Sequence, residues 1–174
     1  QAWPAVFSGA VGVSRYVNVG ISGATVQQAL DQELPKALAA TADLATVWLN
    51  VNDIVKFVSA EQYEGRLRTL VKALRRGGRA RVLVANTPPL EVLPAARPYA
   101  ALAAGAVASY NAAIARVVQE EGAELVDLHA AGLAAQRDGR APALVAQDGF
   151  HPSTAGHAAV AAEFLRVYRA ATAR

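Results

Sequence analysis

The hydrophobic positions of the chain fall into short continuous runs, separated by longer stretches in which apolar residues recur at helical spacing. Residues 44–49 and 81–86 are nearly continuous apolar runs that contain β-branched side chains. Such runs are typical of strands buried on both faces of a parallel sheet. Shorter runs at residues 16–20 and 123–127 predict two further strands. The pattern therefore predicts four strands.

Apolar residues at every third or fourth position predict the helices that connect these strands. Helical spacing is found at residues 26–38, 59–76 and 107–121 and from residue 153 onward, with a short amphipathic helix or turn at residues 2–7. Pro35 is expected to interrupt the first of these helices. Ser59 and Gln62 have the form of a capping box. Residues 128–148 show no clear period and are expected to form a loose segment.

The alternation of strands and helices predicts an α/β fold with a parallel sheet and right-handed crossovers. No repeat or linker divides the sequence, so residues 1–174 are expected to form a single domain. Ligands of such sheets bind at the carboxyl ends of the strands. Functional residues are therefore expected in the polar turns that follow the predicted strands.

Composition excludes several classes of protein. Hydrophobic residues make up 53% of the chain and charged residues only 18%, against about 25% charged in soluble domains. No apolar run approaches the ~20 residues of a spanning helix, so no integral membrane protein is expected. The net charge of +3 includes an arginine cluster at residues 75–81, near a predicted helix end. Without interleaved aromatic residues this cluster does not predict a nucleic-acid partner.

The chain contains no cysteine and only three histidines, which lack metal-ligand spacing. Neither a metal nor an organic cofactor is therefore expected. There is also no methionine, so residue 1 is expected to follow a cleavage or to lie inside a longer polypeptide. No signal peptide is visible, and secretion and a cytoplasmic location both remain open.

An Asp and a His three residues apart are the first candidates for chemistry. Asp148 and His151 flank a glycine, and Pro152 precedes the last predicted helix. At this spacing the carboxylate can reach the imidazole and fix its tautomer, as a general base requires. The alternative is purely structural, with the Asp capping a turn and the His beginning a helix.

Two other candidates follow predicted strands. Asn52 lies in a polar cluster after residues 44–49, and its side-chain N–H could donate to a developing oxyanion. Gly23 lies in a small-residue turn, where its backbone N–H could face a ligand. Their structural alternatives are an amide that satisfies turn backbone and a glycine with positive φ. A second Asp–His pair, Asp127 and His129, is interpreted as structural, and His157 as non-catalytic.

Taken together, three segments resemble sequence blocks of the SGNH/GDSL hydrolase superfamily. Residues 18–25, 48–53 and 148–152 resemble its second, third and fifth blocks. The resemblance implies a three-layer α/β/α flavodoxin-like fold. It also implies a serine hydrolase that cleaves carboxylic esters or thioesters (esterase, lipase or thioesterase type) through an acyl-serine intermediate.

The resemblance also assigns roles to four residues of this chain. Gly23 and Asn52 would form the oxyanion hole, and His151 would be the base that Asp148 orients. One departure is Asn50, which stands where the third block usually has glycine.

The larger departure is the absence of the first block, Gly-Asp-Ser, which carries the nucleophile and should precede Trp3. None of the chain's own serines fits that block. In this fold the first strand lies inside the sheet, between the strands that begin near Tyr16 and Leu44. The domain is therefore expected to be N-terminally incomplete, with its first strand and nucleophilic serine upstream of residue 1. The expected partners are that segment and a small-molecule ester or thioester.

Two alternatives share the same residues. One is a catalytically inactive binding protein that keeps the fold and the cleft. The other is an acyltransferase that passes the acyl group to an alcohol or sugar instead of water. Residues 88–99 and 130–145 are expected to wall the substrate pocket.

Overall fold

The computed structural model describes residues 1–172, which divide into two compact units. We call residues 17–86 and 108–125 the sheet unit, because nearly the whole sheet lies in them. We call residues 1–16, 87–107 and those from Val126 onward the helical unit. Each unit is described by itself.

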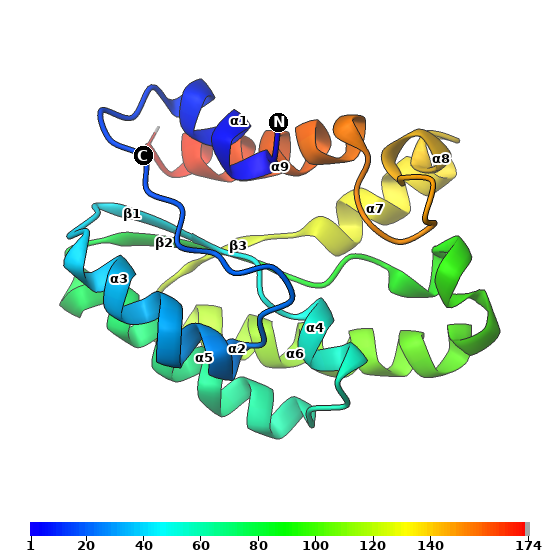
Figure 1. The fold of residues 1–174 in the computed structure, drawn as a ribbon, viewed down its shortest axis with the longest axis horizontal. Coiled ribbons are helices and arrows are strands. Elements are labelled where there is room, and N and C mark those ends of the chain that lie inside the picture. The colour runs from blue at the N-terminus through cyan, green and yellow to red at the C-terminus, as the bar shows by residue number, and fades with distance from the viewer. Residues whose placement is uncertain (173–174) are drawn as a thin grey trace. The chain divides into compact units, whose positions relative to one another are not determined.

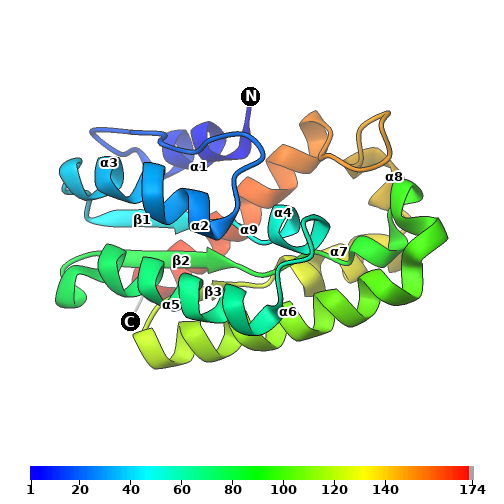
Figure 2. The ribbon, with the colours of Figure 1, turned by 60° about the horizontal axis from the view of Figure 1, so that its bottom comes forward.

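The sheet has three strands in the order β1-β2-β3, as Figure 2 shows. The strands are β1 (Leu44–Val47), β2 (Arg81–Ala85) and β3 (Glu124–Val126). β1 and β2 run parallel, with Leu44 opposite Arg81 and Val47 opposite Val84. Four of the five residues of the central strand β2 are buried, as the continuous apolar run predicted. Three of the four predicted strands and the α/β fold class are thus confirmed.

The helices α5 (Ala60–Arg75) and α6 (Ala100–Glu121) supply much of the core of the sheet unit. Figure 1 shows α5 and α3 (Leu34–Ala39) below the sheet. The rings of Tyr63 and Tyr110 lie 4.4 Å apart, and each hydroxyl donates to a backbone carbonyl at 2.7 Å. Buried aromatic residues with satisfied hydroxyls fix the register of the two helices. Ser59 caps α5 by accepting a hydrogen bond from the N–H of Gln62, as predicted.

The predicted helix at residues 26–38 is interrupted, also as predicted. It consists of α2 (Val26–Gln28), a π-helical turn η1 (Ala29–Glu33) and α3, and Pro35 lies at the start of α3. Proline has no N–H for the preceding turn, so the regular α-helical bonding pattern cannot pass through it. Thr25 begins α2 with a complete capping box. After β1 comes α4 (Val51–Val55), and after α5 comes η2 (Arg76–Gly78), a 3₁₀ turn.

The prediction of a strand at residues 16–20 is wrong. This segment has no regular secondary structure, and the side chains of Tyr16 and Val17 are 44% and 46% exposed. β1 is an edge of the sheet, and within the described residues no strand pairs with its outer side. A β-prone segment without a neighbouring strand has no partner for its backbone groups and stays irregular.

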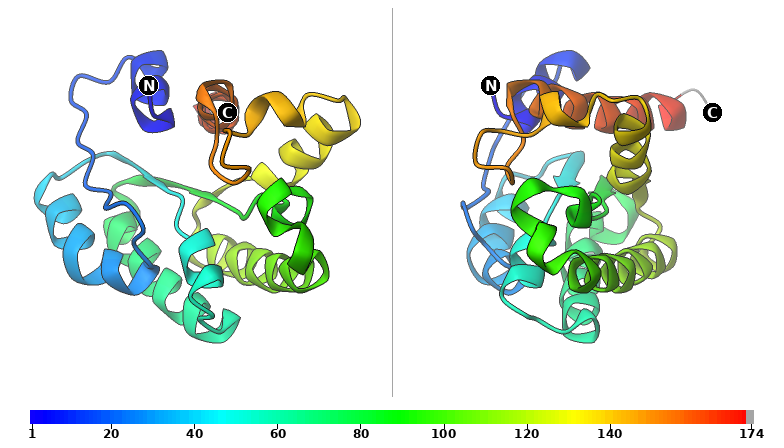
Figure 3. Two further views of the ribbon diagram at one scale, coloured as in Figure 1. Left: turned by 45° about the vertical axis from the view of Figure 1, so that its right-hand side comes forward. Right: turned by 90° about the vertical axis from the view of Figure 1, so that its right-hand side faces the viewer.

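The helical unit contains α1 (Trp3–Val11), α7 (Leu128–Arg137), α8 (Ala141–Leu144), α9 (Thr154–Thr172) and the 3₁₀ turns η3 (Leu90–Val92) and η4 (Pro94–Tyr99). α1 lies along α9, as both views in Figure 3 show. The rings of Trp3 and Phe164 stack with centroids 4.3 Å apart, and Phe7 is buried against the same ring. The predicted N-terminal helix is confirmed.

The expectation of a loose segment at residues 128–148 is wrong, because α7 and α8 occupy much of it. Asp127 caps α7 by accepting a hydrogen bond from the N–H of Ala130. α7 is rich in alanine, which favours a helix but adds little to a hydrophobic stripe. The hydrophobic periodicity of α7 was therefore too weak to predict this helix from the sequence. Asp127 and His129 lie at a helix start rather than on an extended segment.

Within residues 1–172, one helical stretch, Pro94–Glu121, is long and apolar enough to cross a membrane, with a mean hydropathy of 1.4 in its most apolar window. Its C-terminal half places Tyr110, Ile114 and Val117 in the core of the sheet unit. Packing on the core thus accounts for the apolar face of that half.

Candidate active site

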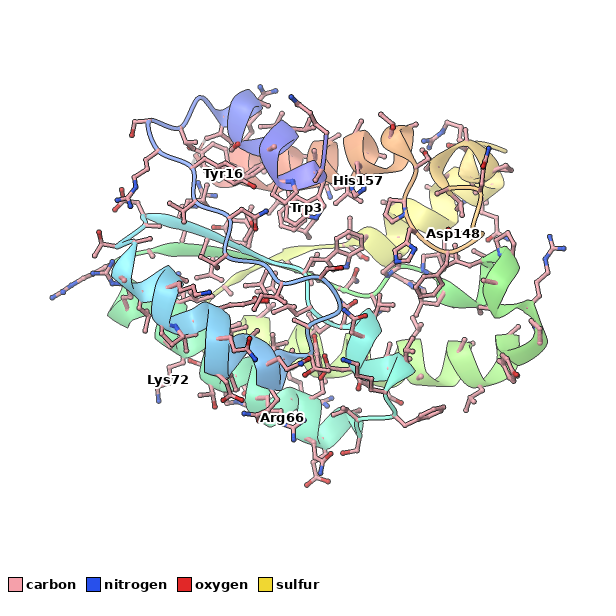
Figure 4. The ribbon with its side chains drawn as sticks, viewed as in Figure 1. Trp3, Tyr16, Arg66, Lys72, Asp148 and His157 are labelled. Atoms are coloured by element: carbon pink, nitrogen blue, oxygen red, sulfur yellow. The ribbon has the colours of Figure 1, made fainter. Side chains whose placement is uncertain are left out.

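Asp148 and His151 form a hydrogen-bonded pair in the loop before α9. The Oδ2 atom of Asp148 lies 2.7 Å from Nδ1 of His151, and Figure 4 shows Asp148 in this loop. Its Oδ1 atom accepts the backbone N–H groups of Phe150 at 2.9 Å and His151 at 3.0 Å. The Phe150 N–H, followed by the His151 side chain, lowers the pKa of Asp148 from its ordinary 3.8 to about 2. The carboxylate is therefore ionised at neutral pH, where it holds the Nδ1 proton and leaves Nε2 free to accept one.

A short antiparallel clamp holds this loop. The N–H of Ala146 donates to the His151 carbonyl at 2.8 Å, and the N–H of Ser153 donates to the Leu144 carbonyl at 2.9 Å. The Ser153 hydroxyl donates to the Ala143 carbonyl at 2.7 Å and accepts the N–H of Gly156 at 3.1 Å. Ser153 thus joins the end of α8 to the start of α9 on either side of the Asp–His pair.

Gly149 brings the Asp–His loop against the Pro- and Ala-rich segment at residues 88–99. Its φ of +73° favours glycine, and a Cβ atom here would lie 3.1 Å from Cβ of Pro94. The Gly149 carbonyl accepts the N–H of Ala95 at 3.2 Å. Phe150 meets the His151 imidazole edge to face, with ring centroids 5.2 Å apart. The two loops of the helical unit are therefore one connected structure.

Gly23 and Asn52 lie together in the sheet unit. Asn52 belongs to α4, which begins just after β1, and its Nδ2 atom donates to the Ala24 carbonyl at 3.0 Å. An amide nitrogen carries two protons, so one N–H of Asn52 remains unused within residues 1–172. Gly23 has φ of +77°, with open space where a side chain would project. Its N–H has no hydrogen-bond acceptor in the described part of the chain. The loop thus presents two N–H donors.

Two buried side chains next to Asn52, those of Asp53 and Asn50, hold the neighbouring backbone in place. Asp53 is fully buried, and its Oδ2 atom accepts the N–H of Val26 at 3.0 Å. Burial raises the pKa of Asp53, and the Val26 N–H opposes that rise. Asn50 is 2% exposed and donates from Nδ2 to the Ala85 carbonyl at 3.2 Å. The asparagine in place of the glycine therefore ties the end of β1 to the end of β2.

The structure thus brings each pair of predicted residues together within its own unit, Asp148 with His151 and Gly23 with Asn52. Two neighbouring residues were not predicted to matter. Ser153 was considered only as a nucleophile, although it lies two residues after the His. Lys56, the C-cap residue of α4, donates from Nζ to the Gly23 carbonyl at 2.9 Å. No local pattern in the sequence indicates this contact. Among residues 1–172 no group of three His, Asp or Glu side chains could hold a metal ion.

The sequence profile of the GDSL-like lipase/acylhydrolase family matches residues 1–159. The chain belongs to this family, which supports an ester hydrolase activity. No functionally curated protein is significantly similar to it in sequence.

Solved structures with similar folds include Axe2, an acetylxylan esterase from Geobacillus stearothermophilus. It is 26% identical with a TM-score of 0.76, and the match covers 95% of this chain and 80% of Axe2. LAE5, an alpha/beta hydrolase enzyme from the metagenome of Lake Arreo, is 24% identical with a TM-score of 0.77 over 95% and 80% of the chains. The acetyl xylan esterase AlAXEase is 15% identical with a TM-score of 0.77 over 95% and 89%. The latter two are likenesses of fold.

Proposed function

We propose that the chain is the greater part of a serine hydrolase that cleaves carboxylic esters or thioesters through an acyl-serine intermediate. The observation that carries this proposal is the 2.7 Å contact between the ionised Asp148 carboxylate and the imidazole of His151. An imidazole oriented in this way can take a proton from a hydroxyl group as a general base. Axe2 has a catalytic mutant with a His-to-Ala substitution, which supports a catalytic histidine in an esterase of similar fold.

In the proposed reaction, a serine hydroxyl attacks the acyl carbonyl carbon while Nε2 of His151 takes the hydroxyl proton. The carbonyl oxygen becomes an oxyanion and accepts the N–H of Gly23 and the free N–H of Asn52. The tetrahedral intermediate then breaks its bond to the alcohol or thiol, which leaves with the proton from His151. Water repeats the sequence on the acyl-serine and releases the carboxylic acid.

We further propose that a segment outside residues 1–174 supplies the serine. Ser8 and Ser153 donate to the carbonyls of Ala5 and Ala143, and Ser59 caps α5. These bonds leave them structural roles. The outer side of β1 carries no strand within the described residues, and residues 17–20 of the same unit have no regular secondary structure. A strand between β1 and residues 17–20 would give the backbone groups of both segments hydrogen-bond partners. It would also bring the nucleophile to the carboxyl end of the sheet.

The substrate proposed is an ester with a short acyl group. The acetylxylan esterases among the similar structures support an acetyl ester of a saccharide as the first compound to try. The small side chains and prolines of the 88–99 segment, which is bonded to the Asp–His loop through Ala95, support a narrow acyl site.

The test uses the polypeptide that contains residues 1–174 with its upstream segment. It should hydrolyse p-nitrophenyl acetate, and a fluorophosphonate probe should label one serine of the upstream segment. His151→Ala should lower kcat by several orders of magnitude. The remaining rate should exceed that of the reaction in water by ~10³–10⁴-fold, through substrate binding and the oxyanion hole. His157→Gln, in the same unit, is the matched control and should keep its activity. If the probe labels no serine and the protein does not hydrolyse the ester, the catalytically inactive binding protein is favoured. If an added alcohol is converted into its ester, the acyltransferase is favoured.

A further inference from the structure

α4 and its C-cap residue Lys56 contact residues 23–26, the glycine loop of the sheet unit, at three points. Nζ of Lys56 donates to the Gly23 carbonyl at 2.9 Å, and Nδ2 of Asn52 donates to the Ala24 carbonyl at 3.0 Å. Oδ2 of Asp53 accepts the N–H of Val26 at 3.0 Å. Two side chains of α4 and that of its C-cap Lys56 thus bind three of four consecutive residues in the loop.

Of the three contacts, the one made by Lys56 has no structural necessity. Its side chain is exposed, so its hydrogen bonds compete with water and add little stability. The turn is closed without it, because the N–H of Ala24 donates to the Ile21 carbonyl at 3.1 Å. The cap of α2 is also complete without it, through Thr25 and Gln28.

Lys56 nevertheless acts on the residue that presents the free N–H. The Gly23 carbonyl and the Gly23 N–H flank one Cα atom whose φ is +77°, a glycine torsion that no side chain restrains. A cation bound to the carbonyl limits rotation about this Cα atom and so limits the direction of the N–H. The same ammonium group lies 3.4 Å from Oε1 of Gln28, which accepts the N–H of Thr25 at 3.0 Å. Lys56 is thereby joined to both ends of the loop.

We infer that Lys56 is a positioning residue of the oxyanion hole, which fixes the direction of the Gly23 N–H and places a positive charge beside the developing oxyanion. The inference rests on the proposed function. A fixed positive charge near the site of charge development stabilises the transition state more than the ground state, so its effect falls on kcat rather than on substrate binding. Arginine can make the same contact with the same charge, whereas methionine can fill the same volume without either.

The test compares Lys56→Met and Lys56→Arg with Lys72→Met in the polypeptide that includes the upstream segment. Lys72 extends from α5 away from the loop (Figure 4) and is the matched control for loss of one charge. Lys56→Met should lower kcat about 10-fold with KM changed less than about 2-fold, because one charge-assisted hydrogen bond is lost. Lys56→Arg should recover kcat to within about 3-fold, and Lys72→Met should leave it unchanged.

A second readout does not depend on activity. The NMR order parameter of the Gly23 N–H should fall in Lys56→Met, because the carbonyl contact that restrains the direction of this N–H is lost. A kcat of Lys56→Met within about 2-fold of the parent, or a loss equalled by Lys72→Met, would overturn the inference. His151→Ala, measured in parallel, separates the two proposals. If that variant keeps full activity the proposed function fails, and the order parameter of the Gly23 N–H alone decides whether Lys56 restrains the loop.

Discussion

At the scale of single residues, the ionisation state of Asp148 determines what His151 can do. The carboxylate accepts two backbone N–H groups as well as the imidazole. All three bonds favour the charged form, so the pKa falls to about 2. The ionised Asp148 carboxylate therefore stabilises the folded state fully at any pH above the ordinary pKa of an aspartate. This stabilisation is lost as the pH falls through the lowered pKa of about 2. Asp148 should thus contribute no titration to activity in the neutral range.

Asp148→Asn tests this role. The amide can offer its N–H to Nδ1 and favour the wrong imidazole tautomer, so kcat should fall by about 10²–10⁴-fold with little change in KM. The measurement is a pH–kcat curve from about pH 4 to about pH 9 for both proteins. The parent should lose no activity through Asp148 over that range. A variant with the parent's kcat at every pH would exclude an orienting role.

Asn52→Ala should lower kcat by about 10²–10³-fold, the usual cost of one oxyanion donor. The same change removes the donor to the Ala24 carbonyl, so Tm must be measured beside kcat to separate the two effects. Asn52→Asp keeps the shape but replaces the donor with an acceptor, and it should be at least as slow. Near-normal turnover in a folded Asn52→Ala protein would remove Asn52 from the oxyanion hole.

At the scale of elements, the clamp before α9 depends on close packing at Gly156. A Cβ atom at this position would overlap the Leu144 carbonyl oxygen and lie 3.0 Å from Cβ of Pro152. The Leu144 carbonyl is also the acceptor for the N–H of Ser153. α8 and α9 can therefore approach closely here only around a glycine.

Gly156→Ala should lower the free energy of unfolding by about 1–3 kcal/mol, as forced overpacking usually does, and should disturb the Asp–His loop. Gly65→Ala is the control within α5, because open space surrounds its Cβ position. It should raise stability by about 0.5–1 kcal/mol through helix propensity. Urea unfolding of both variants gives the comparison. If Gly156→Ala were as stable as the parent protein, the structure would accommodate the contact with the Leu144 carbonyl at no cost in free energy.

The sequence predicted most elements and the contact between Asp148 and His151 because local signals encode them. Continuous apolar runs identified β1 and β2, and the spacing of Asp148 and His151 favoured their contact. The strand predicted at residues 16–20 failed because a strand needs a neighbour, which a local pattern cannot supply. α7 was missed because alanine gives little periodic signal. The reach of Lys56 to Gly23 spans 33 residues, and no pattern along the chain encodes such a contact.

At the scale of the whole molecule, the proposed strand beside β1 leads to a prediction about activity. β1 ends the sheet on one side, and no serine was assigned as nucleophile within the chain. Residues 1–174 alone should therefore fail to hydrolyse p-nitrophenyl esters. Adding the upstream segment as a separate peptide should restore turnover in proportion to its binding. Robust turnover by the isolated chain, with a labelled serine inside it, would show that the nucleophile has been misassigned.

The same bare edge of β1 has a practical consequence. A strand with one unpaired edge, in a chain that also has an exposed, proline-free run at residues 16–21, offers a template for other copies of the chain. Residues 1–174 on their own should therefore aggregate and precipitate at high concentration. A lysine introduced into residues 16–21 should prevent this aggregation.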